Sequence, residues 1–381
     1  SHTFMAIPLF ILMGNILAHT GIADDLFTAL HYWAARIRGG LAMGTVSAGA
    51  ILAAMSGTSE AGTLTVGVMA LPTMLKRGYN KNIAIGSIAA GGLLGILIPP
   101  SIIAILYSAL SGVSLGKVYF AAFIPGLLLS FLYILYIGIR AQLQPELCPI
   151  ITKEEDLSWA AKFKAAKAVV LPFLIILVVL GGIYSGATTP TEAAGVGATM
   201  ALIIAIVKRR LSIKRLNDAL LSTFKLFGMI AWMIMCVTVF TSVYNALGAP
   251  QLIIRAVELF PMGGFGVIIV MQLSLFILGM IMDDFALMFL TIPIYVPIVT
   301  QLGFDPVWFG VLIMVNMQCA WLTPPYGFNL FYMRSITPPE ISTVEIYKSV
   351  LPFVGLQLIC LILIMIFPQI ATWLPSLVFS Q

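Results

Sequence analysis

Charged residues are scarce in this chain of 381 residues: only 9% are Asp, Glu, Lys or Arg, whereas 60% are hydrophobic. Soluble domains carry about 25% charged residues, so the composition excludes a soluble enzyme and indicates a polytopic membrane protein. The 20 Lys and Arg residues outnumber the 15 Asp and Glu residues, and they lie in short loops between apolar runs. This pattern predicts cytoplasmic loops beside a lipid bilayer, with no nucleic-acid partner.

Cysteine and histidine are equally few, at 4 and 3 residues. The cysteines are scattered through apolar runs, where they act as small buried side chains, so we expect neither a disulfide framework nor a transition-metal site. The sequence has no ATP-binding loop, because GVSLGK at 112–117 is one residue short of a P-loop and is followed by Val118. No catalytic constellation with supporting context is present. We therefore expect neither an enzyme nor an organic cofactor.

The stretch at 54–62 (AMSGTSEAG) combines small and hydroxyl residues with one acid, between apolar arms at 41–55 and 63–75. A helix needs about 20 apolar residues to cross a bilayer, so a re-entrant helical hairpin is predicted. Its break places the oxygens of Ser56, Thr58 and Ser59 at membrane depth, which is tolerated only inside protein or along a wet cavity. Such breaks mark binding sites in transporters. The alternative is one glycine-rich spanning helix with a polar packing face.

The second half of the chain repeats the landmarks of the first half. GFD at 303–305 follows GYN at 78–80, and LTPP at 322–325 follows LIPP at 97–100, both at an offset of about 225 residues. A second pair of apolar arms, 263–282 and 285–300, surrounds Asp283 at nearly the same offset. The sequence therefore predicts two repeats, each with a hairpin and a proline-broken span.

The distribution of charge predicts that the two repeats are inverted. The turn after the first hairpin carries Lys76, Arg77 and Lys81, whereas its counterpart at 301–306 carries no basic residue. Positive-inside logic puts the first turn in the cytoplasm and the second outside. It also places in the cytoplasm the loops 140–167, 208–215 and 334–348. The predicted fold is an all-α polytopic membrane protein with two inverted-topology repeats.

Four breaks should meet near the middle of the membrane: the two hairpin tips and the proline breaks at 99–100 and 323–325. Proline frees the carbonyl four residues earlier, so the carbonyls of Gly95, Ile96, Ala320 and Trp321 become available. Such oxygens suit Na⁺. The helix halves that restart after each break point their positive N-termini at the same place, which favours an anionic substrate.

The acidic and amide side chains near these breaks each have two possible roles. Asp283 and Asp284 are intramembrane acids and hence functional candidates, unless the tip lies in a solvated loop. Glu60 is either a site residue or a pairing group. Buried amides on the second broken span either bind helix to helix or touch a ligand; these are Asn316, Gln318 and Asn329.

Several motifs resemble those of one family, the large membrane subunit of TRAP (tripartite ATP-independent periplasmic) transporters. They include SGTSEAG, LIPPS, GMIMDD and LTPPYGFNLF. The resemblance implies an elevator-type secondary transporter in the bacterial inner membrane, with a fixed scaffold and a moving domain. It also implies coupling to at least two Na⁺ ions, a small four-helix membrane subunit, and a periplasmic substrate-binding protein.

The resemblance further implies roles for individual residues. Ser56, Gly57, Ser59 and Gly95 would hold one Na⁺, and Asp283 with Thr323 a second; the substrate would face Thr58, Pro100, Pro325 and Asn329. The implied division is scaffold at 1–38, 117–262 and 334–381, and transport domain at 39–116 and 263–333. Because the apolar run at 4–18 begins at once, we also expect segments upstream of Ser1.

The functional hypothesis from the sequence is Na⁺-coupled import of a small, carboxylate-type organic anion delivered by a binding protein. One alternative is a stand-alone Na⁺/carboxylate symporter without a binding protein. Another is a structural membrane subunit that does not transport, although a scaffold has no reason to keep broken helices at membrane depth.

Overall fold

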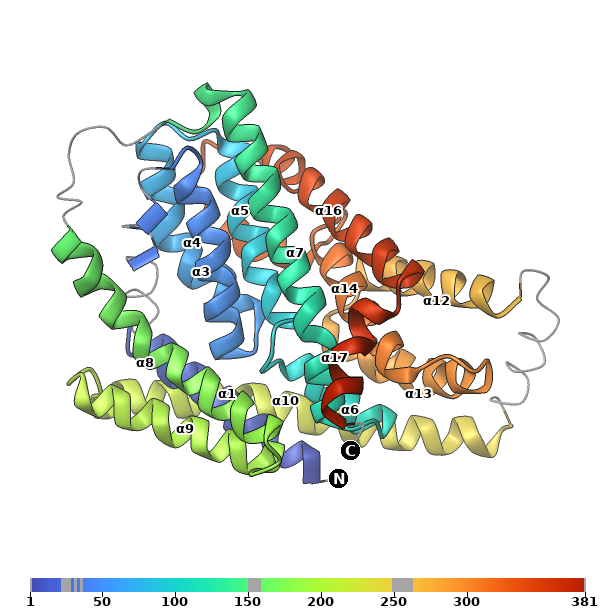
Figure 1. Cartoon of the computed structure of the whole chain (residues 1–381). Coiled ribbons are helices and arrows are strands. Elements are labelled where there is room, and N and C mark those ends of the chain that lie inside the picture. The colour runs from blue at the N-terminus through green and yellow to red at the C-terminus, as the bar shows by residue number, and fades with distance from the viewer. Residues whose placement is uncertain are drawn as a thin grey trace.

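The computed structural model describes residues 2–21, 29–30, 33–34, 37–149, 159–248 and 263–379, and these are helical with no β-strand (Figure 1). The all-α prediction is therefore confirmed. The sequence further predicts two amphipathic helices at the membrane interface, at 24–38 and 250–260. The first lies largely outside the described residues and the second wholly outside them.

The helices follow one another without intervening sheets. The first half contains η1 (His2–Met5), α1 (Ala6–His19), α3 (Gly40–Ser56), α4 (Ser59–Lys76), α5 (Lys81–Leu93), η2 (Leu94–Ile96), α6 (Ile102–Ser111), α7 (Leu115–Leu143) and η3 (Pro145–Leu147). The middle contains α8 (Trp159–Tyr184), α9 (Pro190–Val207) and α10 (Ile213–Ala246). The last part contains α12 (Gly263–Gly279), α13 (Asp284–Gln301), α14 (Pro306–Trp321), α15 (Phe328–Ile336), α16 (Thr343–Ile366) and α17 (Gln369–Phe379).

The order of elements is the same in the two predicted repeats. Each has a hairpin (α3–α4 or α12–α13), then two helices separated by a Pro-Pro break (α5–α6 or α14–α15), then a long helix (α7 or α16). Both Pro-Pro peptide bonds, Pro99-Pro100 and Pro324-Pro325, are cis. The inversion of one repeat relative to the other across the membrane stays a prediction.

Among the described residues, five helices are long and apolar enough to cross a membrane: α7, α9, α10, α13 and α16. The hairpin arms are longer than predicted, with 17 residues in α3 and 18 in α4. At 1.5 Å per residue α3 measures about 26 Å, only slightly less than a hydrocarbon core of about 30 Å. The re-entrant interpretation therefore rests on the breaks and not on helix length.

Two sequence-based boundaries are wrong. The loop predicted at 140–167 is shorter, because α8 already begins at Trp159 in a run of strong helix formers, WAAKFKAAK. The apolar run at 349–374 predicts one last span, but the structure divides it into α16 and α17. Phe367 adopts φ −118° and ψ 77°, as expected of a residue that precedes proline and is disfavoured in the α region.

Close glycine contacts hold the first hairpin on the first broken helix. A Cβ atom on Gly49 of α3 would lie 2.6 Å from the backbone of Gly91 on α5. A Cβ atom on Gly92 would lie 2.0 Å from the hydroxyl of Thr63 on α4. Both approaches are closer than any side chain permits, so the absence of a Cβ atom sets the spacing of the three helices, which lie side by side in Figure 1.

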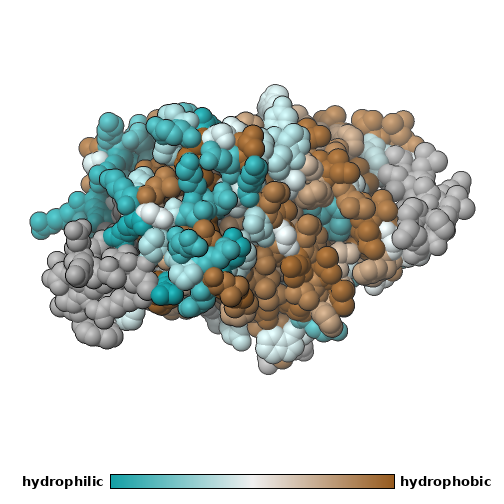
Figure 2. Space-filling view, turned by 90° about the horizontal axis from the view of Figure 1, so that it is seen from above, coloured by the Kyte–Doolittle hydropathy of each residue, from teal (hydrophilic) through white to brown (hydrophobic). Residues whose placement is uncertain are grey.

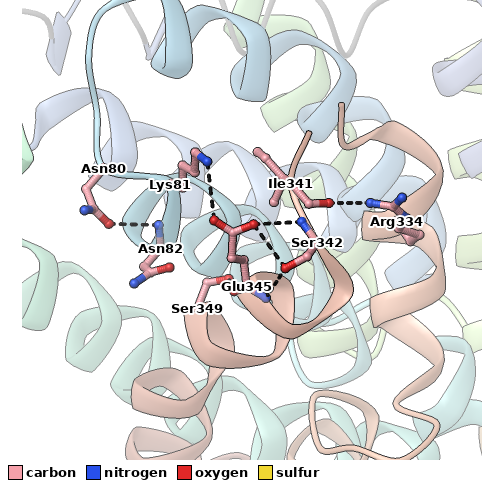
Figure 3. A network of polar contacts seen from close by, with 8 residues as sticks. All are labelled: Asn80, Lys81, Asn82, Arg334, Ile341, Ser342, Glu345 and Ser349. Atoms are coloured by element: carbon pink, nitrogen blue, oxygen red, sulfur yellow. Dashed lines mark hydrogen bonds and ion pairs between the residues drawn. The ribbon is translucent and has the colours of Figure 1, made fainter. Parts of the chain in front are cut away.

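Three of the segments predicted to be cytoplasmic contact one another, and Figure 3 shows two of them, the turn at 78–82 and the loop before α16. The Nζ of Lys81 pairs with the Oε1 of Glu345 at 3.3 Å, while Ser342 and Glu345 form a capping box at the start of α16. The backbone amide of Asn80 donates to the backbone carbonyl of Leu147 at 2.9 Å. The turn at 78–81 thus contacts the loops that follow α7 and precede α16, as expected if all three lie on the same side of the membrane.

The cysteines differ in their surroundings. Cys148, Cys319 and Cys360 are buried, as predicted, whereas Cys236 on α10 is exposed. Burial raises the pKa of Cys148, which lies in the loop after η3, to about 11. Its thiol is therefore neutral and unreactive at physiological pH.

We expect Gly92→Ala to destabilise the protein by about 1–3 kcal/mol, because the new methyl group must displace Thr63 or separate α4 from α5. The measurement is the thermal unfolding midpoint of the purified protein in detergent. Gly355→Ala on α16 is the matched control, since nothing lies within 4 Å of its added Cβ atom. Equal midpoints for the two variants would contradict the packing argument.

Candidate functional site

The tip of the first hairpin is a two-residue break between α3 and α4. Gly57 adopts φ +69°, a left-handed conformation that favours glycine. The hydroxyl of Ser56 donates to the carbonyl of Thr58 at 3.2 Å and lies 3.4 Å from the amide of Thr58. Ser56 and Ser59 are buried and Thr58 is half-buried, so the predicted hydroxyl groups surround one tight turn.

This tip contacts the first proline break. The amide of Ile102 donates to the carbonyl of Gly57 at 3.3 Å. A Cβ atom on Gly57 would lie 3.2 Å from the carbonyl oxygen of Pro100. The predicted residues Gly57 and Pro100 therefore lie side by side, and η2, which contains Gly95, packs against α3.

The carbonyl of Ile96, predicted to be available, is not free. Ser101 caps α6 by accepting from the amide of Ala104 at 3.3 Å, and its hydroxyl donates to the carbonyl of Ile96 at 2.6 Å. Serine directly after a Pro-Pro pair and before an apolar helix is an N-cap signal, so the sequence could have indicated that Ser101 caps α6.

The second hairpin tip carries the two acids. Asp283 caps α13, with its Oδ1 accepting from the amide of Ala286 at 2.8 Å. Asp284 is buried, with 7% of its surface exposed, and its Oδ1 accepts from the amide of Phe285 at 3.0 Å. The carboxylate of Asp284 is thus enclosed by protein and does not lie in a solvated loop.

The end of α12 packs against the last turn of α14, just before the second proline break. A Cβ atom on Gly279 would lie 2.8 Å from the side chain of Ala320. The hydroxyl of Thr323 donates to the carbonyl of Cys319 at 2.7 Å, and its amide donates to the carbonyl of Ala320 at 3.1 Å. Ala320, predicted to offer a free carbonyl, therefore has a partner. Pro325 is exposed, and its carbonyl accepts from the hydroxyl of Tyr347 at 3.3 Å.

Glu60 and Tyr332 connect the two halves. The hydroxyl of Tyr332 on α15 donates to Oε1 of Glu60 on the first hairpin at 2.6 Å. Both side chains lie close enough to Asp284 to interact with its charge, and Tyr332 is also within electrostatic range of Asp283. The two hairpin tips and α15 therefore belong to one region of the structure.

Asn329 is fully buried between helices. The side-chain NH₂ group of Asn329 donates to the carbonyl of Ala89 on α5 at 2.8 Å, and its side-chain oxygen accepts from the hydroxyl of Thr63 on α4 at 2.8 Å. Of the two readings of this side chain, the structure shows the helix-to-helix contact. A contact between Asn329 and a substrate stays a prediction.

The sequence did not predict the bond between α12 and α14. Asn316 donates to both the carbonyl and the side-chain oxygen of Gln272, at 2.6 and 2.7 Å. Gln272 is an isolated polar residue within an apolar run, which was the available signal. The described part of the chain contains no group of three or more His, Cys, Asp or Glu placed to hold a metal ion. A cation at the tips would thus be bound by hydroxyls, carbonyls and single carboxylates.

Comparison with known proteins agrees with this arrangement. Residues 1–370 match the family described as "Tripartite ATP-independent periplasmic transporter, DctM component". The chain belongs to this family. It is therefore a multi-pass protein of the bacterial inner membrane, and the recognition from the sequence motifs is confirmed.

Relatives with different substrates are about equally similar to this DctM-family chain. The C4-dicarboxylate TRAP transporter large permease protein DctM of Vibrio cholerae is 33% identical, with 99% of this chain and 86% of the relative covered. The ectoine/5-hydroxyectoine permease UehC of Ruegeria pomeroyi is 30% identical, covering 100% and 87%. The sialic acid permease protein SiaT of Haemophilus influenzae is 33% identical, covering 99% and 60%.

Solved transporters share the fold at low identity. The Alcanivorax borkumensis YdaH transporter superposes with a TM-score of 0.68 at 15% identity, covering 95% of this chain and 84% of that protein. Neisseria gonorrhoeae MtrF gives a TM-score of 0.66 at 13% identity, covering 95% and 80%. The fold is thus that of a membrane transporter.

We expect Gly57→Ala to separate the first hairpin tip from the Pro100 break. The left-handed backbone costs an alanine roughly 1–2 kcal/mol, and the new methyl group must also displace the Pro100 carbonyl. Gly112→Ala is the matched control, because Gly112 has φ +75° but nothing within 4 Å of an added Cβ atom. Both variants should lose similar thermal stability from backbone strain, and only Gly57→Ala should lose substrate uptake. Unchanged uptake in Gly57→Ala would contradict a functional tip-to-break contact.

Proposed function

We propose that this chain is a Na⁺-coupled permease that imports a small organic anion by an elevator motion. The observation that carries the proposal is the approach of each hairpin to the broken helix of its own repeat, at Gly57 against Pro100 and at Gly279, the last residue of α12, against Ala320 near the end of α14. Broken helices that meet within a bundle are how secondary transporters place polar backbone around an ion and a substrate.

The two tips offer different ligands to cations. At the first tip the hydroxyls of Ser56 and Ser59 and the backbone of Gly57 and Gly95 provide neutral oxygens for one Na⁺. At the second tip the Asp283 carboxylate uses Oδ1 to cap α13. Its other oxygen can bind a second Na⁺ with the hydroxyl of Thr323. That hydroxyl already lies beside the Cys319 carbonyl, so hydroxyl and carbonyl are presented to the ion together.

The substrate would lie between the tips, near Thr58, Pro100 and Pro325. No Lys or Arg belongs to the tips or the breaks. Recognition of a carboxylate would therefore depend on bound Na⁺ and on the N-termini of α4, α6, α13 and α15, each of which begins at a tip or a break. Without an arginine side chain to fix the orientation of the carboxylate, the site would accept substrates of different shapes. This agrees with relatives that are named for C4-dicarboxylate, sialic acid and ectoine transport.

The remaining elements of the proposal concern partners and motion. A small four-helix membrane subunit would complete the scaffold, and a periplasmic binding protein would deliver the substrate. The segments 39–116 and 263–333 would move against a frame formed by the rest of the chain. A binding protein confines the substrate before transport, so it can supply the specificity that the membrane site lacks.

The deciding experiment is uptake into proteoliposomes that contain this chain and the small subunit encoded beside it. Uptake is measured with and without an inward Na⁺ gradient, and with and without the neighbouring binding protein. We expect uptake to require both. Uptake with Na⁺ but without the binding protein would favour a stand-alone symporter, and uptake indifferent to Na⁺ would overturn the cation assignments.

A second prediction isolates the charge of Asp283. Asparagine also caps helices well, so Asp283→Asn keeps α13 intact while removing the carboxylate. We expect a Na⁺ dependence of uptake shifted about tenfold or more to higher concentration, as for the loss of a charged ligand. Asp305→Asn is the matched control, since Asp305 likewise caps α14 through Oδ1. Wild-type Na⁺ dependence in Asp283→Asn would remove this residue from the site.

A further inference from the structure

A cavity lies in a groove between α12 and α16, and no residue of either hairpin tip lines it. Its volume is about 540 Å³, within the range of roughly 300–1,000 Å³ that small-molecule sites occupy. Nine of its lining residues are apolar, and two are the amides Gln272 and Asn316. Residues from α12, α14 and α16 thus form an apolar cleft with one polar pair.

The groove opens onto an apolar, exposed surface of the molecule. Phe265 and Leu273 on α12 are 43% and 56% exposed, and Ile362 on α16 is 52% exposed. These helices lie on the half of the molecule where Figure 2 shows a broad hydrophobic area. Water does not fill an apolar groove at hydrocarbon depth, so an apolar chain is the occupant that the walls favour.

The polar pair in this groove is only half satisfied. Asn316 uses its NH₂ group to donate twice to Gln272, at 2.6 and 2.7 Å. Nε2 of Gln272 and Oδ1 of Asn316 then have no hydrogen-bond partner, although the two residues are only 5% and 1% exposed. One buried donor and one buried acceptor remain unpaired beside an apolar groove, and such groups call for a partner.

We propose that this groove binds a single-chain amphipathic molecule whose polar end both donates and accepts a hydrogen bond. Long-chain alcohols and protonated fatty acids have this chemistry. A plain hydrocarbon would match the walls but leave both amide atoms unpaired. An ester or an ionised carboxylate only accepts, so it would leave Oδ1 of Asn316 without a donor.

Occupancy of the groove would have a mechanical consequence. The occupant contacts α12 of the second hairpin and α16 of the proposed frame at once, so it would hinder sliding between them. This consequence rests on the proposed function, whereas binding itself does not. A binding measurement therefore tests the site whether or not the elevator proposal holds.

The test uses three photoreactive probes of equal chain length, a fatty alcohol, a fatty acid and an alkane, each with a chain diazirine. The full chain is labelled in lipid nanodiscs and the modified residues are mapped by mass spectrometry. We expect the alcohol, and the acid at pH 5, to label groove residues about fivefold more than the alkane, as for one net hydrogen bond. Labelling by the acid should fall at pH 8. Equal labelling by all three probes would overturn the proposal.

Two variants with matched controls locate the site. Ile362→Trp fills the groove and should abolish labelling there, whereas Ile359→Trp, also exposed on α16 but not lining the groove, should not. Gln272→Leu should reduce the polar probes to the level of the alkane. Gln357→Leu controls for loss of a buried amide, because Gln357 also lacks partners but lies outside the groove. Labelling that persists in Ile362→Trp would place the probes elsewhere.

Discussion

Backbone groups inside a membrane protein must find partners within the protein, and this requirement shapes the hairpin tips and the proline breaks. Each of the four breaks is closed by groups next to it or opposite it. Ser101 donates to the Ile96 carbonyl, the Ile102 amide bonds to Gly57, and Thr323 donates to Cys319. Asp283 accepts from the backbone amide of Ala286 in the first turn of α13. The breaks are thus stable features, and their remaining oxygens are held in fixed directions.

The two halves solve this problem with different chemistry. The first tip is closed by backbone, through a left-handed glycine that allows the carbonyl of Gly57 to reach Ile102. The second tip is closed by a carboxylate side chain, and a further carboxylate, Asp284, is enclosed behind it. Repeats with the same order of helices therefore close their tips differently, with a backbone carbonyl at the first tip and a carboxylate at the second. This difference would allow two cations to be bound with unequal affinity.

Local signals explain which features could be predicted from the sequence. Paired prolines and runs of small polar residues act on their own backbone, so the breaks and tips were found close to their true positions. The division between α16 and α17 was not predicted, although Pro368 lies at it. A single proline does not identify a helix end in this chain, because Pro125 and Pro352 lie inside helices. The contacts of Asn329, Asn316 and Glu60 depend on partners far away in the chain, and no local pattern specifies them.

Buried side-chain amides have two different roles in this protein: one holds helices together, and the other leaves unpaired groups beside a groove. The Asn329 side chain is paired in both directions, with Ala89 and Thr63, so it fixes α15 to the first hairpin and its broken helix. In the Gln272–Asn316 pair, Asn316 donates twice to Gln272, but one donor and one acceptor stay unpaired. A fully paired amide adds rigidity, whereas a half-paired amide lowers the free energy of any occupant that completes it. The position of the incomplete pair, beside an apolar groove between the second hairpin and α16, therefore decides which molecules can act on this part of the protein.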